Sequence, residues 1–278
     1  MGAPVTPRAR AIVHRAVAAA PPVVVCTLVL LTSMAAATTV HAQGARGTAA
    51  SPPSAKAAAP VDLTGYWESL VADEDWVYRM VTPRPGDYAG VPLKPAGLQI
   101  MAGWDPAKDT AADEQCKSYG APAIMRVPEH LHITWQDEQT LKLETDAGEQ
   151  TRLFYFVPSM TAAHGPRTWQ GYSVAEWEFQ RQGGARGGPG KTTGGALKVT
   201  TSNLKAGYLR KNGVPYSEKT EVMEYFDPVQ ESNGDGLMVV TSLVNDPVYL
   251  FSPFDTTNNF QKLSSAVGWK PSACSAMW

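Results

Sequence analysis

The stretch HLHITWQDEQTLKLETDAGEQTRLFYF, residues 130–156, decides the fold class. Three runs rich in β-branched and aromatic residues, at 130–135, 140–145 and 151–156, are separated by the polar turns QDEQ and DAGE. Short runs of this kind, bounded by turn residues, are typical of consecutive antiparallel strands. The stretch therefore predicts a three-stranded meander.

The sequence on both sides extends this pattern. One or two strands are predicted within residues 65–81, and further strands around residues 121–127, 171–179, 196–204, 221–226, 237–244 and 259–263. About eight to ten strands at regular spacing, with little helix, predict an all-β protein in which an antiparallel meander closes into a barrel, or packs as a sandwich. Residues 82–120 form an irregular, Pro-rich insertion with one short helix, for which Asp105 is the expected N-cap and Gly120 the stop. The glycine-rich residues 181–195 are expected to form a mobile loop.

The first residues predict export. Arg8, Arg10 and Arg15 precede an apolar run at 23–37, and Val40-His41-Ala42 fits a cleavage site, so residues 1–42 are predicted to be a signal peptide. The Ala/Pro-rich residues 43–60 are a predicted disordered spacer, and residues 61–278 a single domain. This organisation predicts a periplasmic or secreted protein with no stable membrane span once the signal is removed.

Cysteine usage and charge narrow the class further. Cys26 lies in the signal, and in an oxidising compartment Cys116 and Cys274 most simply form a disulfide, with two free thiols as the alternative. The formal net charge is −2 and no basic stripe occurs, which argues against nucleic acid as a partner. The sequence leaves the oligomeric state open.

The central meander also offers a candidate catalytic cluster. Turns of three residues would place His132 opposite Glu144 and Arg152 opposite Lys142, so that all four share one strand face. One hypothesis is a periplasmic enzyme in which His132 and Glu144 act as an acid–base pair oriented by Arg152. The alternative is that this polar face is a solvated outer surface, because burying it without full pairing is costly.

Cofactor signals are weak. His130-x-His132 has the spacing of a metal-ligand pair, which His164 and Glu144 would have to complete, but surface histidines explain the pattern equally well. The run GGARGGPGKTTGG lacks the strand before it and the helix after it that a phosphate-binding loop needs. We therefore predict neither a metal nor a cofactor.

Aromatic residues support a second hypothesis, in which the barrel binds a small hydrophobic or amphipathic molecule. Tyrosine and arginine residues gather around the Asn212-Gly213 turn, and the segment VNDPVYLFSPF, residues 244–254, places aromatic residues after an Asp-Pro turn. The predicted pocket or rim residues are Trp67, Trp135, Tyr155, Tyr208, Arg210, Tyr216 and Tyr249. A third possibility is an envelope interaction protein without catalytic activity.

Two resemblances accompany these patterns. Gly65-x-Trp67, the meander and the late NDPVY turn, residues 245–249, resemble lipocalin-like (calycin) barrels, which implies that Trp67 closes one barrel end. In that superfamily a late Arg usually lies across this Trp; the chain has no Arg after Arg210, so another residue must cover Trp67. Phrases such as DLTGYW, WQGYSVAEWE and GYLRKNGVPYS look like an uncharacterised family of exported bacterial β-rich proteins, which implies location and architecture but no activity.

Overall fold

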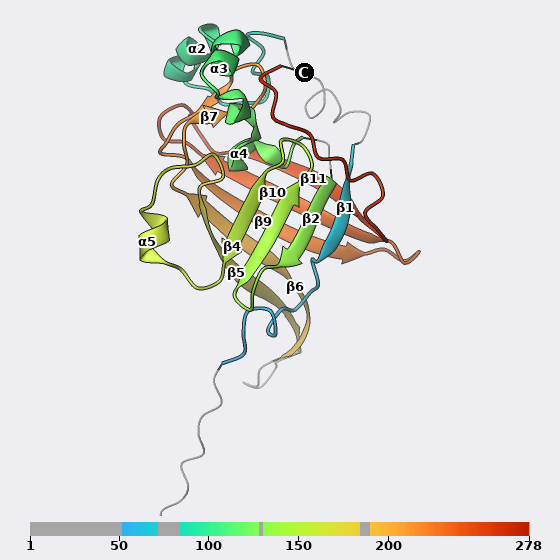
Figure 1. The fold of residues 1–278 in the computed structure, drawn as a ribbon. Coiled ribbons are helices and arrows are strands. Elements are labelled where there is room, and N and C mark those ends of the chain that lie inside the picture. Colours follow the sequence, from blue (N-terminus) through green and yellow to red (C-terminus); the bar gives the residue numbers. More distant parts are fainter. Residues whose placement is uncertain (1–51, 72–83, 128–129, 184–189, 278) are drawn as a thin grey trace, which may run out of the picture. The chain divides into compact units, whose positions relative to one another are not determined.

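The computed structural model describes residues 52–71, 84–127, 130–183 and 190–277 (Figure 1). The predicted signal peptide and the first part of the predicted spacer lie outside these residues, as does the middle of the glycine-rich segment 181–195. The described part of that segment is strand rather than loop, because β5 continues to Gln182 and β6 begins at Lys191. Within the described residues, no helix is both long and apolar enough to cross a membrane.

Nine strands close into a barrel in the order β1-β11-β10-β9-β6-β5-β4-β3-β2, which confirms the predicted all-β barrel. The strands are β1 (Gly65–Leu70), β2 (His130–Trp135), β3 (Thr140–Thr145), β4 (Thr151–Tyr155), β5 (Tyr172–Gln182), β6 (Lys191–Ser202), β9 (Glu221–Gln230), β10 (Gly236–Asn245) and β11 (Phe254–Leu263).

The barrel is not a continuous antiparallel meander, because β4 and β5 are parallel. A closed ring can be antiparallel at every junction only if its number of strands is even, so nine strands require a parallel junction. Parallel neighbours need a connection that returns along the barrel. Here that connection is the segment 156–171, which contains the short helix α5 (Met160–Ala163) beside the barrel wall (Figure 1). We call it the crossover.

The turn between β3 and β4 corrects the predicted strand register. Arg152 lies opposite Leu143, and Lys142 lies opposite Leu153. The predicted three-residue turn is in fact closed by the Thr145 N–H, which donates to the carbonyl of Gln150 over 2.9 Å. The extra turn residue is Glu149, which joins Gly148 in the left-handed region (φ 51° and 71°). This one-residue difference turns Arg152 from the outer face to the interior.

Apolar side chains fill much of the barrel interior. Alternate residues of every strand point inward, and the largest of them, Trp67, Phe154, Phe226 and Phe260, are at most 1% exposed. We call this cluster the barrel core.

A cap closes the upper end of the barrel in Figure 1. It comprises α2 (Pro95–Ala102), α3 (Pro106–Ala111), the 3₁₀ helix η1 (Gln115–Tyr119), α4 (Ala121–Ile124) and the hairpin of β7 (Gly207–Tyr208) and β8 (Pro215–Tyr216). Asp105 caps α3 as predicted, accepting from the Ala107 N–H. The predicted helix over 105–120 is nonetheless broken, since Asp113 has a φ of 58°. The predicted strand 121–127 is wrong, because Pro122 stands in the first turn of α4 there.

The cap has its own apolar cluster, and the disulfide ties it to the chain end. Val91, Leu209 and Tyr216 pack with Val222 and Val244 from the rim of the barrel. We call this cluster the cap core. Cys116 of η1 and Cys274 lie at disulfide distance, with their sulfur atoms 2.04 Å apart.

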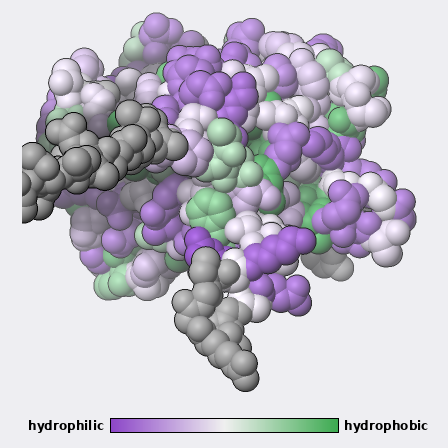
Figure 2. Space-filling view, turned by 90° about the horizontal axis from the view of Figure 1, so that it is seen from below, coloured by the Kyte–Doolittle hydropathy of each residue, from purple (hydrophilic) through white to green (hydrophobic). Residues whose placement is uncertain are grey.

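The lower end of the barrel is covered by aromatic side chains and the described end of the predicted spacer. Trp135, Phe156 and Trp177 pack together, with ring centroids 5.2–6.3 Å apart. The Trp177 indole donates to the carbonyl of Ala55, and the Lys56 N–H donates to the carbonyl of Glu138. Figure 2 views this end and shows hydrophobic residues between hydrophilic ones. The Ala/Pro-rich composition of the spacer does not predict that its residues 54–56 contact the lower end of the barrel.

A layer of buried polar side chains separates the barrel core from the cap core. Along β9, Glu224 stands between Val222 of the cap core and Phe226 of the barrel core. Its carboxylate accepts from both terminal nitrogens of Arg152, and both side chains are fully buried. Thr201 accepts from Arg152 over 3.2 Å and also hydrogen-bonds with Ser173 over 2.8 Å. We call these four residues, with Ser242 and Asn258, the polar layer.

Asn258 contributes a buried side-chain amide to the polar layer. The residue is 1% exposed, and neither its Oδ1 nor its Nδ2 has a hydrogen-bond partner among the described residues. Because unpaired buried polar groups destabilise a fold, Asn258→Leu should raise the free energy of unfolding by about 1–3 kcal/mol. Urea denaturation measures this, with Asn259→Leu on the exposed face of β11 as the control that gains little. A loss of stability in Asn258→Leu would instead mean that a bound water or ligand pairs with the amide.

Candidate ligand pocket beside the parallel strands

A pocket of about 260 Å³ lies on the outer side of the barrel wall, between β4 and the end of the crossover. We call it the seam pocket, because it adjoins the parallel junction, where β4 and β5 share only two residue pairs. Its lining comes from the outer face of β4, the crossover, the first residues of β5 and the residue that follows β6. The lining residues are Thr151, Leu153, Tyr155, Pro166, Thr168, Gln170, Gly171, Tyr172, Ser173 and Asn203.

Two stacked tyrosines provide the aromatic part of the pocket. The rings of Tyr155 and Tyr172 lie 5.3 Å apart at an interplanar angle of 20°. Tyr172 is buried, and its hydroxyl accepts from the Ser159 N–H of the crossover over 2.6 Å. Tyr155 is half-buried. The stack therefore gives the pocket a fixed aromatic wall.

The opposite wall is held by backbone contacts. Thr168 forms a parallel bridge with Leu204, and the Lys205 N–H donates to the carbonyl of Thr168 over 2.7 Å. Gly171 turns the chain into β5 with a φ of 62°, and a Cβ there would overlap the carbonyl oxygen of Ser202. Only glycine fits this close approach. A pocket with fixed walls spends little free energy on ordering when it binds a ligand.

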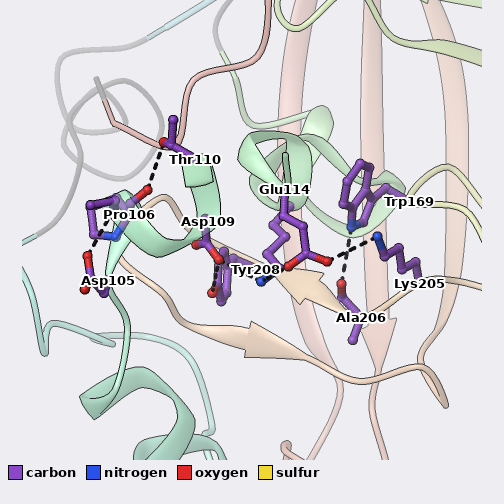
Figure 3. Close-up of polar contacts among 11 residues, drawn as sticks. Asp105, Pro106, Asp109, Thr110, Glu114, Trp169, Lys205, Ala206 and Tyr208 are labelled. Atoms are coloured by element: carbon purple, nitrogen blue, oxygen red, sulfur yellow. Dashed lines mark hydrogen bonds and ion pairs between the residues drawn. The ribbon is translucent and has the colours of Figure 1, made fainter. Parts of the chain in front are cut away.

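The cap supports this wall through Trp169. Figure 3 shows Lys205 reaching Glu114 of the cap, and the Trp169 indole donating to the carbonyl of Ala206. The Lys205 ammonium also lies 4.3 Å from the centre of the Trp169 ring, a cation–π contact. Hydrogen bonding to Lys117 holds the pKa of Glu114 below its usual range, so this carboxylate remains charged at neutral pH. Trp169 thus connects the crossover to Lys205 and Ala206, which lead into β7, and through Lys205 to Glu114 of the cap.

The seam pocket is electrically neutral. Its described lining has three hydroxyl side chains, two amides and two tyrosines, but no Asp, Glu, Lys, Arg or His. Burial raises the pKa of Tyr155 above its usual value, and the neighbouring Tyr172 and Asp137 add to this. Tyr155 therefore remains an uncharged hydroxyl at physiological pH. The lining is suited to an uncharged molecule with polar and apolar parts.

Ser173 connects the pocket to the barrel interior. It lines the pocket, yet it is 2% exposed and belongs to the polar layer through its bond with Thr201. Thr201 in turn accepts from Arg152. At the parallel junction, β4 and β5 share only two residue pairs. Through Ser173, the polar layer reaches the surface pocket at this junction.

The predicted catalytic residues are not brought together. His132 and Glu144 do form a pair, with Nδ1 and Oε2 3.3 Å apart on the outer face, whereas Arg152 lies inside the barrel against Glu224. The His132 ring stacks on Tyr66 at 4.1 Å and meets the edge of Trp269. His130 is the other histidine of the predicted metal pair, and its Nδ1 lies within hydrogen-bonding distance of Asp146 Oδ2, at 2.8 Å. Both imidazoles thus serve packing and turn contacts.

The predicted binding residues are spread over separate places. Trp67 and Trp135 belong to the barrel interior and its lower end, and Tyr155 lines the seam pocket. The remaining four lie in or against the cap: Tyr208, Arg210, Tyr216 and Tyr249.

The cap residues have structural contacts of their own. The Tyr208 hydroxyl donates to Asp109 over 3.3 Å (Figure 3), and burial, helped by Asp109, raises the pKa of Tyr208 to about 12. Arg210 donates to the carbonyl of Ala89 over 2.6 Å. Tyr216 is fully buried, and burial raises its pKa.

The cover of Trp67 is a lysine. Lys262, its direct partner on β11, places its ammonium 5.4 Å from the centre of the Trp67 ring. The indole nitrogen donates to the carbonyl of Leu63 over 2.9 Å. Trp67 is 1% exposed and fills the barrel interior.

Comparisons with protein-family models, with curated proteins and with solved structures found no match to this chain. The function must therefore be argued from the geometry of the chain.

Proposed function

We propose that the protein is an exported binding protein that takes a small, uncharged amphipathic molecule into the seam pocket. One observation carries the proposal: a pocket with fixed walls combines two stacked tyrosines with hydroxyl and amide groups and has no charged side chain in its described lining. Small-molecule sites typically pair apolar and aromatic walls with a few polar groups that fix orientation. Export is supported by the predicted signal peptide and by the two sulfur atoms at disulfide distance.

The barrel interior supports this choice of site. The interior of the barrel is filled by packed apolar side chains and by a polar layer centred on Arg152 and Glu224. Phe154 and Phe226, for example, lie with ring centroids 5.5 Å apart and are both fully buried. A ligand in this region would have to displace well-packed side chains, which is costly. The seam pocket needs no such displacement.

Ligand-observed NMR on the full mature chain tests the proposal. The probes are benzyl alcohol and benzamide as neutral molecules, with benzoate and benzylamine as charged analogues. We expect saturation transfer to the neutral probes and at least tenfold weaker binding of the charged ones, because a charge in an uncharged, half-buried site is poorly solvated.

A pair of variants locates the binding. Tyr155→Ala should weaken binding of the neutral probes about tenfold, since it removes one ring of the stack. Tyr225→Ala is the matched control, because Tyr225 is also half-buried but lies on β9, outside the pocket lining. Equal binding of the neutral probes by the two variants would contradict the proposal.

A further inference from the structure

We infer that the molecule recognised in the seam pocket is a neutral sugar, with one pyranose ring held in the pocket. This inference rests on the proposed function and specifies its ligand. It follows from four features of the pocket: its charge, its hydrogen-bonding groups, its aromatic wall and its size.

The charge of the lining excludes most other polar metabolites. Phosphates and carboxylates are normally held by Arg, Lys or backbone donors at a helix N-terminus, and amines by carboxylates. The described lining offers none of these side chains. The nearby cation Arg167 is directed to the carbonyls of Leu204 and Glu218 and to the Glu218 carboxylate. The polar part of the ligand is therefore uncharged.

The hydrogen-bonding groups of the pocket match hydroxyl groups. Thr151, Thr168, Gln170 and Asn203 each combine a donor and an acceptor in one side chain, as every sugar hydroxyl does. Two of these groups already have backbone partners: the Thr168 oxygen accepts from the Gly171 N–H over 2.9 Å, and the Asn203 amide donates to the carbonyl of Gly165 over 3.0 Å. The Gln170 amide donates to the carbonyl of Tyr119 and to Gln150 Oε1, each over 2.8 Å. These two bonds fix the orientation of the amide and leave its Oε1 buried without a partner among the described residues.

The aromatic wall matches the other side of a sugar. A pyranose presents its C–H bonds on one face and its hydroxyls around the edge. Polarised C–H groups pack favourably against the electron-rich face of an aromatic ring. Tyr155 provides such a face, its ring being fixed by the stack with Tyr172, and Leu153 and Pro166 extend the apolar surface. Purely apolar ligands would use this wall but would strip water from the hydroxyls and amides without replacing it.

The volume sets the number of rings. At about 260 Å³ the pocket lies just below the range typical of sites for drug-sized ligands. One sugar ring is therefore the natural occupant, and any further ring of an oligosaccharide would lie in solvent. Disaccharides should accordingly bind little better than the monosaccharide whose ring enters the pocket.

The test is a titration of the full mature chain, followed by tyrosine and tryptophan fluorescence and by isothermal calorimetry. The sugar panel contains glucose, galactose, mannose and maltose, with glucuronic acid and glucosamine as charged counterparts. The second panel is the pair benzyl alcohol and benzamide. We expect at least one neutral sugar to bind at least tenfold more tightly than its charged counterpart and than either aromatic probe.

Three variants assign the binding to the pocket. Tyr155→Ala should weaken sugar binding about tenfold, whereas Tyr155→Phe, which keeps the ring, should stay within about threefold. Thr151→Trp, at an exposed position of the lining, should block the pocket without removing any of its walls. Thermal melting checks that each variant is folded.

The outcomes separate this inference from the proposed function. If the neutral aromatic probes bind and Tyr155→Ala weakens them while no sugar binds, the sugar inference is overturned and the proposed function stands. Sugar binding that Thr151→Trp leaves unchanged overturns the inference, because the sugar then lies elsewhere. Binding of neither panel overturns both.

Discussion

Replacing Arg152 with methionine should lower the free energy of unfolding by about 3–5 kcal/mol, the largest effect we expect of a single side chain. The change leaves Glu224 fully buried without its only cationic partner in the described interior. A carboxylate in that position must either remain charged without compensation or take up a proton, and both cost free energy. Urea denaturation at neutral pH, monitored by tryptophan fluorescence, measures the loss.

The double variant Arg152→Met with Glu224→Leu provides the control. With both charges gone, most of the loss should be recovered, because a buried ion pair adds little over apolar residues of similar volume. The free energy of unfolding of the single variant Glu224→Gln should fall between those of Arg152→Met and of the double variant. A single variant Arg152→Met as stable as the unaltered protein would contradict the buried position of this pair.

Removing the disulfide should have an effect of similar size. Cys116 and Cys274 are separated by 158 positions, so the cross-link restricts a long loop of the unfolded chain. The chain-entropy model gives about 4–5 kcal/mol for a loop of this length. The variant Cys116→Ala/Cys274→Ala should lose about this much in urea denaturation, and adding a reductant to the unaltered protein should reproduce the loss.

Noncovalent contacts of the chain end set the control for this experiment. The Ser272 N–H donates to the carbonyl of Asp146 over 2.9 Å, and the Ser275 N–H donates to the Tyr119 hydroxyl. These bonds are formed in the folded state whether or not the disulfide is present, so the variant should still fold. A loss that the reductant does not reproduce would show that packing of the cysteine side chains, rather than the cross-link, carries the effect.

Much of the barrel could be predicted from the sequence because its signals are local. The runs at 130–135 and 140–145 match β2 and β3 in both bounds and register. The failures arise where a distant contact decides. Residues 121–127 have an apolar composition that suits a strand, but residues 121–124 form α4, and Ile124 and Met125 pack into the barrel core. The Arg152 register depended on whether Glu149 adopts a left-handed conformation, which its residue type does not predict.

The seam pocket could be predicted only in part. The aromatic character of Tyr155 predicts it as a pocket residue, but Tyr172, Gln170 and Asn203 come from segments whose positions depend on the parallel junction. The buried ion pair did leave a sequence signal. Glu224 alternates with Val222 and Phe226, so it falls on an apolar strand face, and a charge there indicates a buried partner. Its partner could not be named without the correct β4 register.

Hydrogen–deuterium exchange tests the central claim, that the seam pocket is the ligand site, most directly. The full mature chain is compared with and without a saturating amount of the tightest-binding neutral probe from the two panels. The account predicts slower exchange in β4 and in residues 166–173, with no change in β10 and β11. Protection confined to β10 and β11, or to the segment around Trp67, would place the ligand inside the barrel or at its end and contradict the account.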